Sequence, residues 1–243
     1  MPQFWPLPRK EKVWVVRPVP GPHNRQHSIP LLVIVRDVLK YAATANEAKH
    51  IITTGNILVD GRVRKEVKFP VGLMDIIHIP KTNEHFRMML AGKKLLPEKI
   101  SQRDASSKLC KIIAKRIIKG GRLQLTLHDG RTILIDKKPY RPGDTLVLSL
   151  SDQKILNHFS LEQGAGVVIV SGRNMGISGT IKDIRERKNM LEKSTVTLET
   201  KGRDIVTPRG YVFVVSGSAQ HSTQKKKTAA SETDRAKHEE KRA

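Results

Sequence analysis

The chain has 243 residues, a formal net charge of +22 and one cysteine, and 38% of its residues are hydrophobic. This apolar content is sufficient for folded cores, so the chain is more than a basic tail. The longest apolar run, residues 29–35, is far shorter than the roughly 20 residues of a membrane span, and the single Cys110 excludes an internal disulfide or a zinc site built on cysteines.

A polyanion is the expected partner, because lysine and arginine number 45 against 23 for aspartate and glutamate. Anionic lipid is the alternative to nucleic acid, but the basic residues do not gather on an obvious amphipathic surface helix. Every segment carries excess positive charge, which favours a nucleic acid that touches the whole length of the chain. No secretory signal pattern opens the sequence, so a reducing, cytoplasmic location is expected.

The two ends of the chain are predicted to lack compact structure of their own. Residues 1–30 form an extended, Pro-rich basic arm, because the recurring prolines oppose both helix continuation and pairing in a central strand. Trp5 and Trp14 are the residues expected to anchor this arm to a neighbour. Residues 217–243 are rich in Ser, Thr, Lys and Glu, which predicts a disordered charged tail.

Residues 31–92 are predicted to form a small unit in the order helix, helix, hairpin, strand. Apolar residues at helical spacing predict the first helix, over residues 31–39, just after a proline suited to a first turn. Short signals mark the remaining boundaries: a capping box at Thr44 and Glu47, a helix-ending Gly55, and a hairpin turn at Asp60 and Gly61.

This order of elements resembles the small RNA-binding fold named after bacterial ribosomal protein S-four. The resemblance implies that the two helices and the hairpin face structured RNA. The RNA-binding residues that it implies here are Arg36, Lys40, Lys49, His50, Arg62, Arg64 and Lys65. The alternative is that these are ordinary solvated charges on helix and hairpin surfaces.

Residues 93–160 are predicted to form a central basic β domain. Apolar residues alternate with polar ones from residue 123 onward, and turns that contain Gly or Pro separate the runs, as in a small barrel or sheet. Lys111, Lys115 and Arg116 are candidates for phosphate contact. A basic surface without a specific ligand is the alternative for this segment.

Residues 161–216 contain a buried-type strand followed by a glycine-rich loop. Gly172, Gly176 and Gly179 permit positive φ angles and close approach of the backbone to a ligand, but their spacing matches neither a Walker loop nor a dinucleotide-binding loop. The segment resembles a KOW motif, which implies that Arg173, Asn174, Gly176 and Gly179 face nucleic acid, and the basic Arg185 and Arg187 follow. The alternative is a hairpin that only turns the chain.

No catalytic site, metal site or cofactor site can be assembled from the sequence. His23 and His27 are four residues apart but lack the glutamate of the helical zinc motif. Cys110 lies in an apolar segment, which favours a small buried residue over a nucleophile. Aromatic residues make up only 4% of the chain, so stacking of successive bases on a sheet is not expected. We therefore expect recognition of folded or double-stranded RNA by phosphate and shape.

The predicted fold class is α+β, multidomain and mostly β: a small helix–helix–hairpin fold, a central basic β domain and a KOW-type small β-barrel. This order of modules resembles the archaeal and eukaryotic small-subunit ribosomal protein S4e family. Local runs that support the resemblance lie at residues 21–23, 30–32, 39–42, 108–111 and 172–176.

The resemblance implies a structural constituent of the small ribosomal subunit that binds rRNA, with no enzymatic activity and no cofactor. Its implied partners are small-subunit rRNA and neighbouring ribosomal proteins in the cytoplasm, without a membrane and without homo-oligomerisation. One alternative is a KOW-bearing transcription or translation factor that binds the ribosome or RNA polymerase reversibly. The other is an RNA-modifying enzyme with an S-four-like appendage, although the chain after that fold leaves little room for a catalytic domain.

Overall fold

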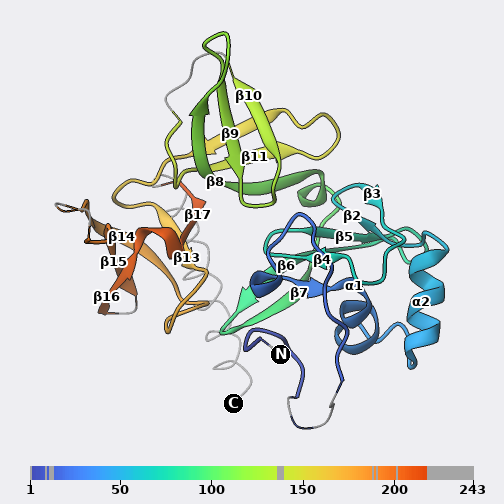
Figure 1. Ribbon diagram of the computed structural model, residues 1–243. Helices are drawn as coiled ribbons and strands as arrows, with labels where there is room; N and C mark the ends of the chain where they lie inside the picture. The colour runs from blue at the N-terminus through green and yellow to red at the C-terminus, as the bar shows by residue number, and fades with distance from the viewer. Residues whose placement is uncertain are drawn as a thin grey trace, which may run out of the picture.

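The computed structural model describes residues 2–8, 10, 14–135, 140–187, 189, 191–200 and 202–217. The predicted charged tail lies outside these residues, apart from Gly217. Three five-stranded antiparallel sheets follow one another along the chain, and among the described residues the two α-helices lie in the first part (Figure 1). Among the described residues, no helix is both long and apolar enough to cross a membrane.

The helices of the first domain begin and end close to the predicted positions. A short strand, β1 (Ile29–Pro30), pairs with β4 (Pro70–Val71) and leads into α1 (Leu31–Val33). A five-residue π-helical turn, η2 (Ile34–Val38), continues α1, so the predicted helix is present but wider in its second half. The capping box at Thr44 starts α2 (Ala45–Thr53) as predicted, with both reciprocal hydrogen bonds formed.

The first sheet has the strand order β3-β2-β5-β6-β7. Its strands are β2 (Leu58–Val59), β3 (Arg62–Val63), β5 (Ile76–Ile79), β6 (Glu84–Ala91) and β7 (Lys94–Ile100). We expected the central domain to begin at residue 93, but β7 pairs with β6 along its whole length. The break in the sequence at Gly92 is therefore a hairpin turn with φ of 57°, and the first domain extends to residue 100.

The N-terminal arm packs onto this domain through its first residues. Phe4, Trp5 and Leu7 are buried in the same core as the helices, and Trp5 Nε1 donates a hydrogen bond of 3.1 Å to the Ser28 carbonyl. Trp5 thus anchors the arm to its own chain, whereas Trp14 is 91% exposed.

The central domain is a sheet in the order β10-β9-β8-β11-β12. Its strands are β8 (Ser107–Ile117), β9 (Leu123–Leu127), β10 (Thr132–Ile135), β11 (Thr145–Ser149) and β12 (Ile155–Phe159). The alternating residues of β9 enclose a core with Cys110, which is buried as expected. A short 3-10 turn, η3 (Asp104–Ser106), connects this domain to β7.

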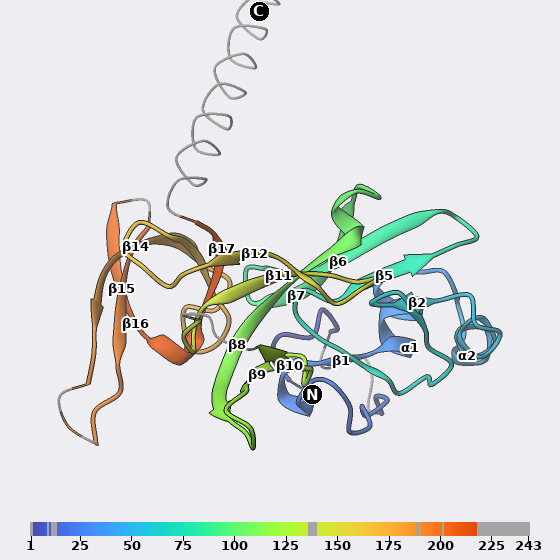
Figure 2. The same ribbon diagram turned by 90° about the horizontal axis from the view of Figure 1, so that it is seen from above.

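The C-terminal domain is a sheet in the order β16-β15-β14-β13-β17. Its strands are β13 (Gly166–Ile169), β14 (Ser178–Arg185), β15 (Thr195–Thr200), β16 (Arg203–Pro208) and β17 (Val212–Ser216). Strand β17 contacts β8, β11 and β12. Figure 2 shows the C-terminal sheet and the first domain on opposite sides of β8 and β11, so all three domains meet around these two strands.

Candidate nucleic-acid interface

Helix α2 and the β2–β3 hairpin present neighbouring basic side chains. A Cβ atom at Gly55, which follows α2 with φ of +81°, would lie 3.2 Å from Val63 Cγ1 and 3.7 Å from Lys65 Cε, so the hairpin packs against the end of the helix. We call the exposed basic residues on and around these elements the S4 surface: Lys40, Lys49, His50, Arg62 and Lys65. Exposed cations on adjacent rigid elements are suited to contact phosphates of a folded RNA.

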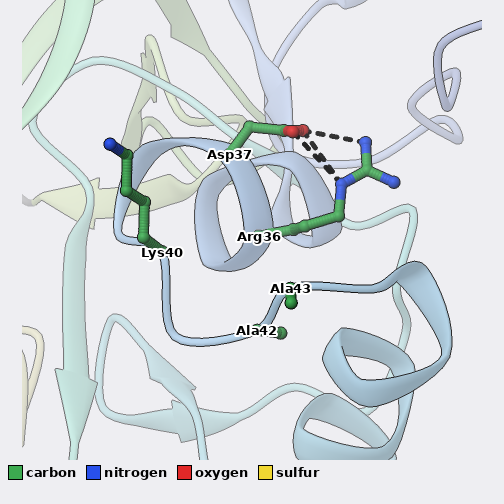
Figure 3. Close-up of a pocket in the computed structure, with 5 residues that line it drawn as sticks. All are labelled: Arg36, Asp37, Lys40, Ala42 and Ala43. Atoms are coloured by element: carbon green, nitrogen blue, oxygen red, sulfur yellow. Dashed lines mark hydrogen bonds and ion pairs between the residues drawn. The ribbon is translucent and has the colours of Figure 1, made fainter.

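Arg36 lies within η2 and Lys40 follows shortly after it, and both line a depression of about 420 Å³ (Figure 3). The Arg36 guanidinium donates to both carboxylate oxygens of Asp37 at 2.9–3.2 Å, which partly neutralises its charge. Lys40 has a φ of 57° and an exposed side chain. Of the two predicted residues, Lys40 is therefore the better placed for a phosphate.

Arg64 has a packing role that the sequence interpretation did not include. Its guanidinium carbon lies 4.4 Å from the centre of the Phe69 ring, a cation–π contact, and the residue is half-buried.

Of the three candidates on β8, Lys111 is turned inward. Its ammonium group donates to the carbonyls of Gly210 and Val212 at 2.7 Å each, which ties β8 to the start of β17. Burial, and then the charge of Arg209, lower the pKa of Lys111 to about 8. Lys115 and Arg116 are exposed, and Lys115 donates to the carbonyl of Tyr140 at 3.1 Å.

The glycines of the β13–β14 loop are explained by close packing. Gly176 has a φ of +84°, and a Cβ atom there would lie 1.6 Å from the carbonyl oxygen of Gly92 in the β6–β7 turn. A Cβ atom at Gly179 would lie 2.4 Å from Thr200 Oγ1 on the neighbouring strand. Close packing within the protein therefore explains why these two positions are glycine, and no bound ligand is needed to explain them.

The polar candidates around this loop face solvent to different degrees. Arg173 and Arg187 are exposed and Asn174 is half-buried. Arg185 is exposed and lies 3.3 Å from the carboxylate of Asp183, an ion pair in solvent that contributes little stability.

Around the loop, Val170, Met175 and Val215 of the C-terminal domain pack against the core of the first domain, and Phe213 is part of that core. We call these four residues, with the contact between Gly92 and Gly176, the apolar junction.

A buried ionic network joins the first domain to the central domain. Lys108 on β8 is fully buried, and its ammonium group lies 2.6 Å from carboxylate oxygens of Asp60 and Asp75 and 3.2 Å from Asp129. Arg131 lies 2.8 Å from Asp60 and 3.2 Å from Asp129. We call these five residues the charged junction.

The buried groups of this junction shift one another's pKa values. Burial alone would lower the pKa of Lys108, but the three carboxylates raise it well above its ordinary value. Burial alone would likewise raise the pKa of Asp75, but Lys108 and His23 hold it well below its usual range. Burial and the charge of Asp75 raise the pKa of Asp60. His23 of the arm, 2.8 Å from Asp75, extends the network to the N-terminal segment.

Cys110, His128 and Asp129 lie close enough to share a metal ion, with their potential ligand atoms within 4.8 Å of one another. Their other contacts argue against such a site. His128 Nδ1 accepts a hydrogen bond from the Lys111 backbone at 3.2 Å, so Nε2 carries the proton and donates to the Leu73 carbonyl at 3.1 Å. Asp129 is already paired with two cations, so a further cation would be repelled.

Sequence reasoning missed the charged junction, although one signal could have found part of it. Lys108 shares its face of β8 with Cys110 and Ile112, two positions apart along an alternating strand, and all three are buried. The alternation therefore places Lys108 inside the domain.

A helix–helix–hairpin unit with an exposed basic surface, followed by two antiparallel sheets, defines a multidomain RNA-binding protein. Comparison with known families gives the same result, since three family descriptions match successive parts of the chain. These are the RS4NT (NUC023) domain at residues 1–26, the S4 domain at residues 29–77 and ribosomal family S4e at residues 82–155.

Relatives match over most of the length. Small ribosomal subunit protein eS4 of Methanocaldococcus jannaschii is 45% identical over 223 residues, which cover 88% of this chain and 90% of the relative. The same protein of Methanothermobacter thermautotrophicus is 43% identical over 215 residues, 88% of each chain. The crystal structure of 30S ribosomal protein S4e from Thermoplasma acidophilum matches with a TM-score of 0.70 and 34% identity, covering 79% of this chain and 97% of that one. The chain belongs to the S4e family of small ribosomal subunit proteins, which confirms the resemblance.

Proposed function

We propose that this member of the S4e family is a structural constituent of the small ribosomal subunit that binds rRNA through phosphate and shape contacts during assembly and translation. The observation that carries the proposal is the S4 surface, on the segment that matches the S4 domain. Exposed lysine and arginine side chains bind phosphate oxygens by charge-assisted hydrogen bonds, which position a protein on RNA without reading bases.

The other exposed candidates extend this interface along the chain. Lys115 and Arg116 on β8, and Arg173, Arg185 and Arg187 around the C-terminal sheet, are available for further phosphate contacts. A KOW-type role for the β13–β14 loop is part of the proposal, with Arg173 and Asn174 facing RNA. Gly176 and Gly179 support the loop by close packing.

In this proposal the partners are small-subunit rRNA and neighbouring ribosomal proteins, and the location is the cytoplasmic ribosome. The protein does not form a homo-oligomer and does not bind a membrane. No enzymatic activity or cofactor is part of it. The alternative of a reversibly bound transcription or translation factor is not favoured, because the relatives that match over 88% of the chain are ribosomal proteins.

Binding of small-subunit rRNA by filter retention at several salt concentrations tests the proposal. Each phosphate that the protein neutralises contributes a slope of roughly 0.7 to 0.9 in log K against log salt. The triple variant Lys49→Ala/Arg62→Ala/Lys65→Ala is expected to lower the slope by about 2 and to weaken binding at least tenfold.

The matched control removes three exposed lysines that are already ion-paired, Lys99, Lys154 and Lys182, each replaced by alanine. The control has the same net charge as the triple variant, so it separates contact from overall charge. A salt response that is flat for the wild type, or equal losses in the two variants, would contradict the proposed interface.

A further inference from the structure

A cleft of about 1110 Å³ lies where the three domains meet, apart from the S4 surface. The cleft is lined by His23 and His27 of the arm, by residues of β8 and of the turn before β11, and by residues 191–194 and 208–211 of the C-terminal domain. This volume exceeds the roughly 300–1,000 Å³ of typical small-molecule sites, so a nucleotide with its sugar and phosphates fits inside.

The charges that line the cleft are predominantly positive. Among the described residues that line it, the cations are Lys111, Arg187, Lys193 and Arg209, and the carboxylate is that of Glu192. Arg187 and Lys193 are exposed, and within the described part of the chain their side chains have no ion-pair partner. Lys111 uses two of its three N–H donors on carbonyls, so one donor is left for a ligand. Such a lining complements an anion.

The cleft is also lined by an aromatic side chain. Tyr211 is 39% exposed, and its ring lies close to Gly172, where a Cβ atom would be 3.2 Å from Tyr211 Cε2. The cleft is also lined by His128 and Phe213, whose rings meet edge to face with their centroids 5.5 Å apart. Burial, and then the charge of Lys108, lower the pKa of His128 to about 4, so this ring is neutral near pH 7. Neutral aromatic rings and cations in the same cleft match the two parts of a nucleotide, the base and the phosphate.

We propose that this interdomain cleft binds one unpaired nucleotide of rRNA, with its base stacked on Tyr211 and its flanking phosphates bound by Arg187 and Lys193. The inference rests on the proposed function, because it assigns a second contact site on the same RNA. It differs from the phosphate-and-shape recognition of the S4 surface in that it requires an unpaired base. An acidic protein segment would use the same cations but would not need the tyrosine ring.

The experiment combines ultraviolet cross-linking with binding to small-subunit rRNA, using the full chain. In the wild type, a nucleotide is expected on the peptide that contains residue 211. Tyr211→Leu is expected to abolish this cross-link and to weaken binding about tenfold, since stacking on one aromatic residue contributes roughly 1–3 kcal/mol. Tyr211→Phe keeps the aromatic ring and is expected to retain both the cross-link and the affinity for rRNA.

The cations are tested by Arg187→Ala/Lys193→Ala, with Lys182→Ala/Arg203→Ala as the charge-matched control on the exposed strands β14 and β16 of the same sheet. We expect the cleft variant to bind rRNA about tenfold more weakly than the control. Both pairs are exposed, so folding is preserved and the test remains valid even if Tyr211→Leu unfolds.

The outcomes separate the two proposals. If the S4-surface triple variant loses binding while all cleft variants bind and cross-link like the wild type, the cleft inference is wrong and the proposed function stands. If neither set alters rRNA binding, the proposed interface fails as well. If the cleft variants lose affinity for a polyglutamate peptide but not for rRNA, the cleft accepts an acidic protein segment and the nucleotide assignment is overturned.

Discussion

The first domain is joined to the central domain and to the C-terminal domain by two different kinds of contact. At the charged junction, Lys108 is surrounded by three carboxylates that come from turns of both domains. At the apolar junction, Met175 and its neighbours pack against a hydrophobic core, and the backbone of Gly176 meets that of Gly92. One junction depends on paired charges and the other on shape.

The difference determines how each junction responds to change. A buried ion pair is costly to desolvate, so it is stable only while every partner is present, and removing one partner leaves uncompensated charge. Apolar contacts have no direction and tolerate substitutions of similar volume. Orientation at the apolar junction therefore depends on the glycine contact, where the backbones approach too closely for any side chain.

The largest expected effect is at the charged junction. Lys108→Met keeps the length of the side chain but removes its charge, which leaves Asp60 and Asp129 buried with Arg131, and Asp75 buried with His23. We expect the free energy of unfolding to fall by about 3–5 kcal/mol, as when one partner of a buried pair is removed. Urea denaturation at neutral pH measures it.

Lys115→Met on the same strand is the control, because Lys115 is exposed. Its effect is expected to stay within about 0.5 kcal/mol. Equal stabilities of the two variants would show that the ionic network does not hold the domains together.

The second prediction concerns the glycine contact. Gly176→Val is expected to destabilise the protein by about 1–3 kcal/mol more than Gly202→Val, the range for overpacking. Both glycines have positive φ angles, +84° and +79°, so both variants carry the same backbone strain. A side chain at position 202 meets nothing within 4 Å, whereas one at 176 meets the Gly92 backbone. Equal melting temperatures would mean that the loop moves away at little cost.

The sequence predicts the local elements well because their signals are short-range. The capping box at Thr44, the helix end at Gly55 and the turn at Asp60 need only neighbouring residues, and all three are present in the structure. Of the three loop glycines that permit a positive φ, Gly172 and Gly176 have one and Gly179 does not.

Contacts between domains have no such signal. Lys108 meets Asp60 and Asp75, which lie 48 and 33 residues earlier in the chain, and a lysine in a basic segment resembles a surface charge. Lys111 is a candidate for phosphate contact for the same reason, and the carbonyls that its ammonium group binds lie about 100 residues later. The boundary expected at residue 93 falls within the β6–β7 hairpin, because a glycine turn within a hairpin resembles a glycine between domains.

A smaller effect is expected for Lys111, which ties the central domain to β17. Its pKa is about 8 in the folded protein, against about 10.4 in an unfolded chain. Between these two values the unfolded state binds more protons, so the free energy of unfolding rises with pH in this window. From about pH 8 to about pH 9.5, we expect the wild type to gain on the order of 1 kcal/mol relative to Lys111→Met. Parallel pH dependences of the two proteins would contradict the lowered pKa, and Lys115→Met serves as the exposed control.

The smallest effect on stability is expected at the tip of the loop that forms the apolar junction. Met175 and Gly176 face the first domain, but Arg173 is exposed and Asn174 is half-buried. Arg173→Ala/Asn174→Ala should therefore leave the free energy of unfolding within about 0.5 kcal/mol of the wild type. If the tip faces RNA, the same variant should bind rRNA about 1–3 kcal/mol more weakly, the range for lost charged hydrogen bonds.

A paired melt and binding titration on this variant and on Gly176→Val decides what the loop does. Loss of affinity without loss of stability in the double variant assigns the tip to RNA and the base of the loop to the junction. If the double variant binds like the wild type while Gly176→Val unfolds, the whole loop serves the apolar junction, and RNA contacts of this domain are to be sought at its other exposed cations, such as Arg185, Arg187 and Lys193.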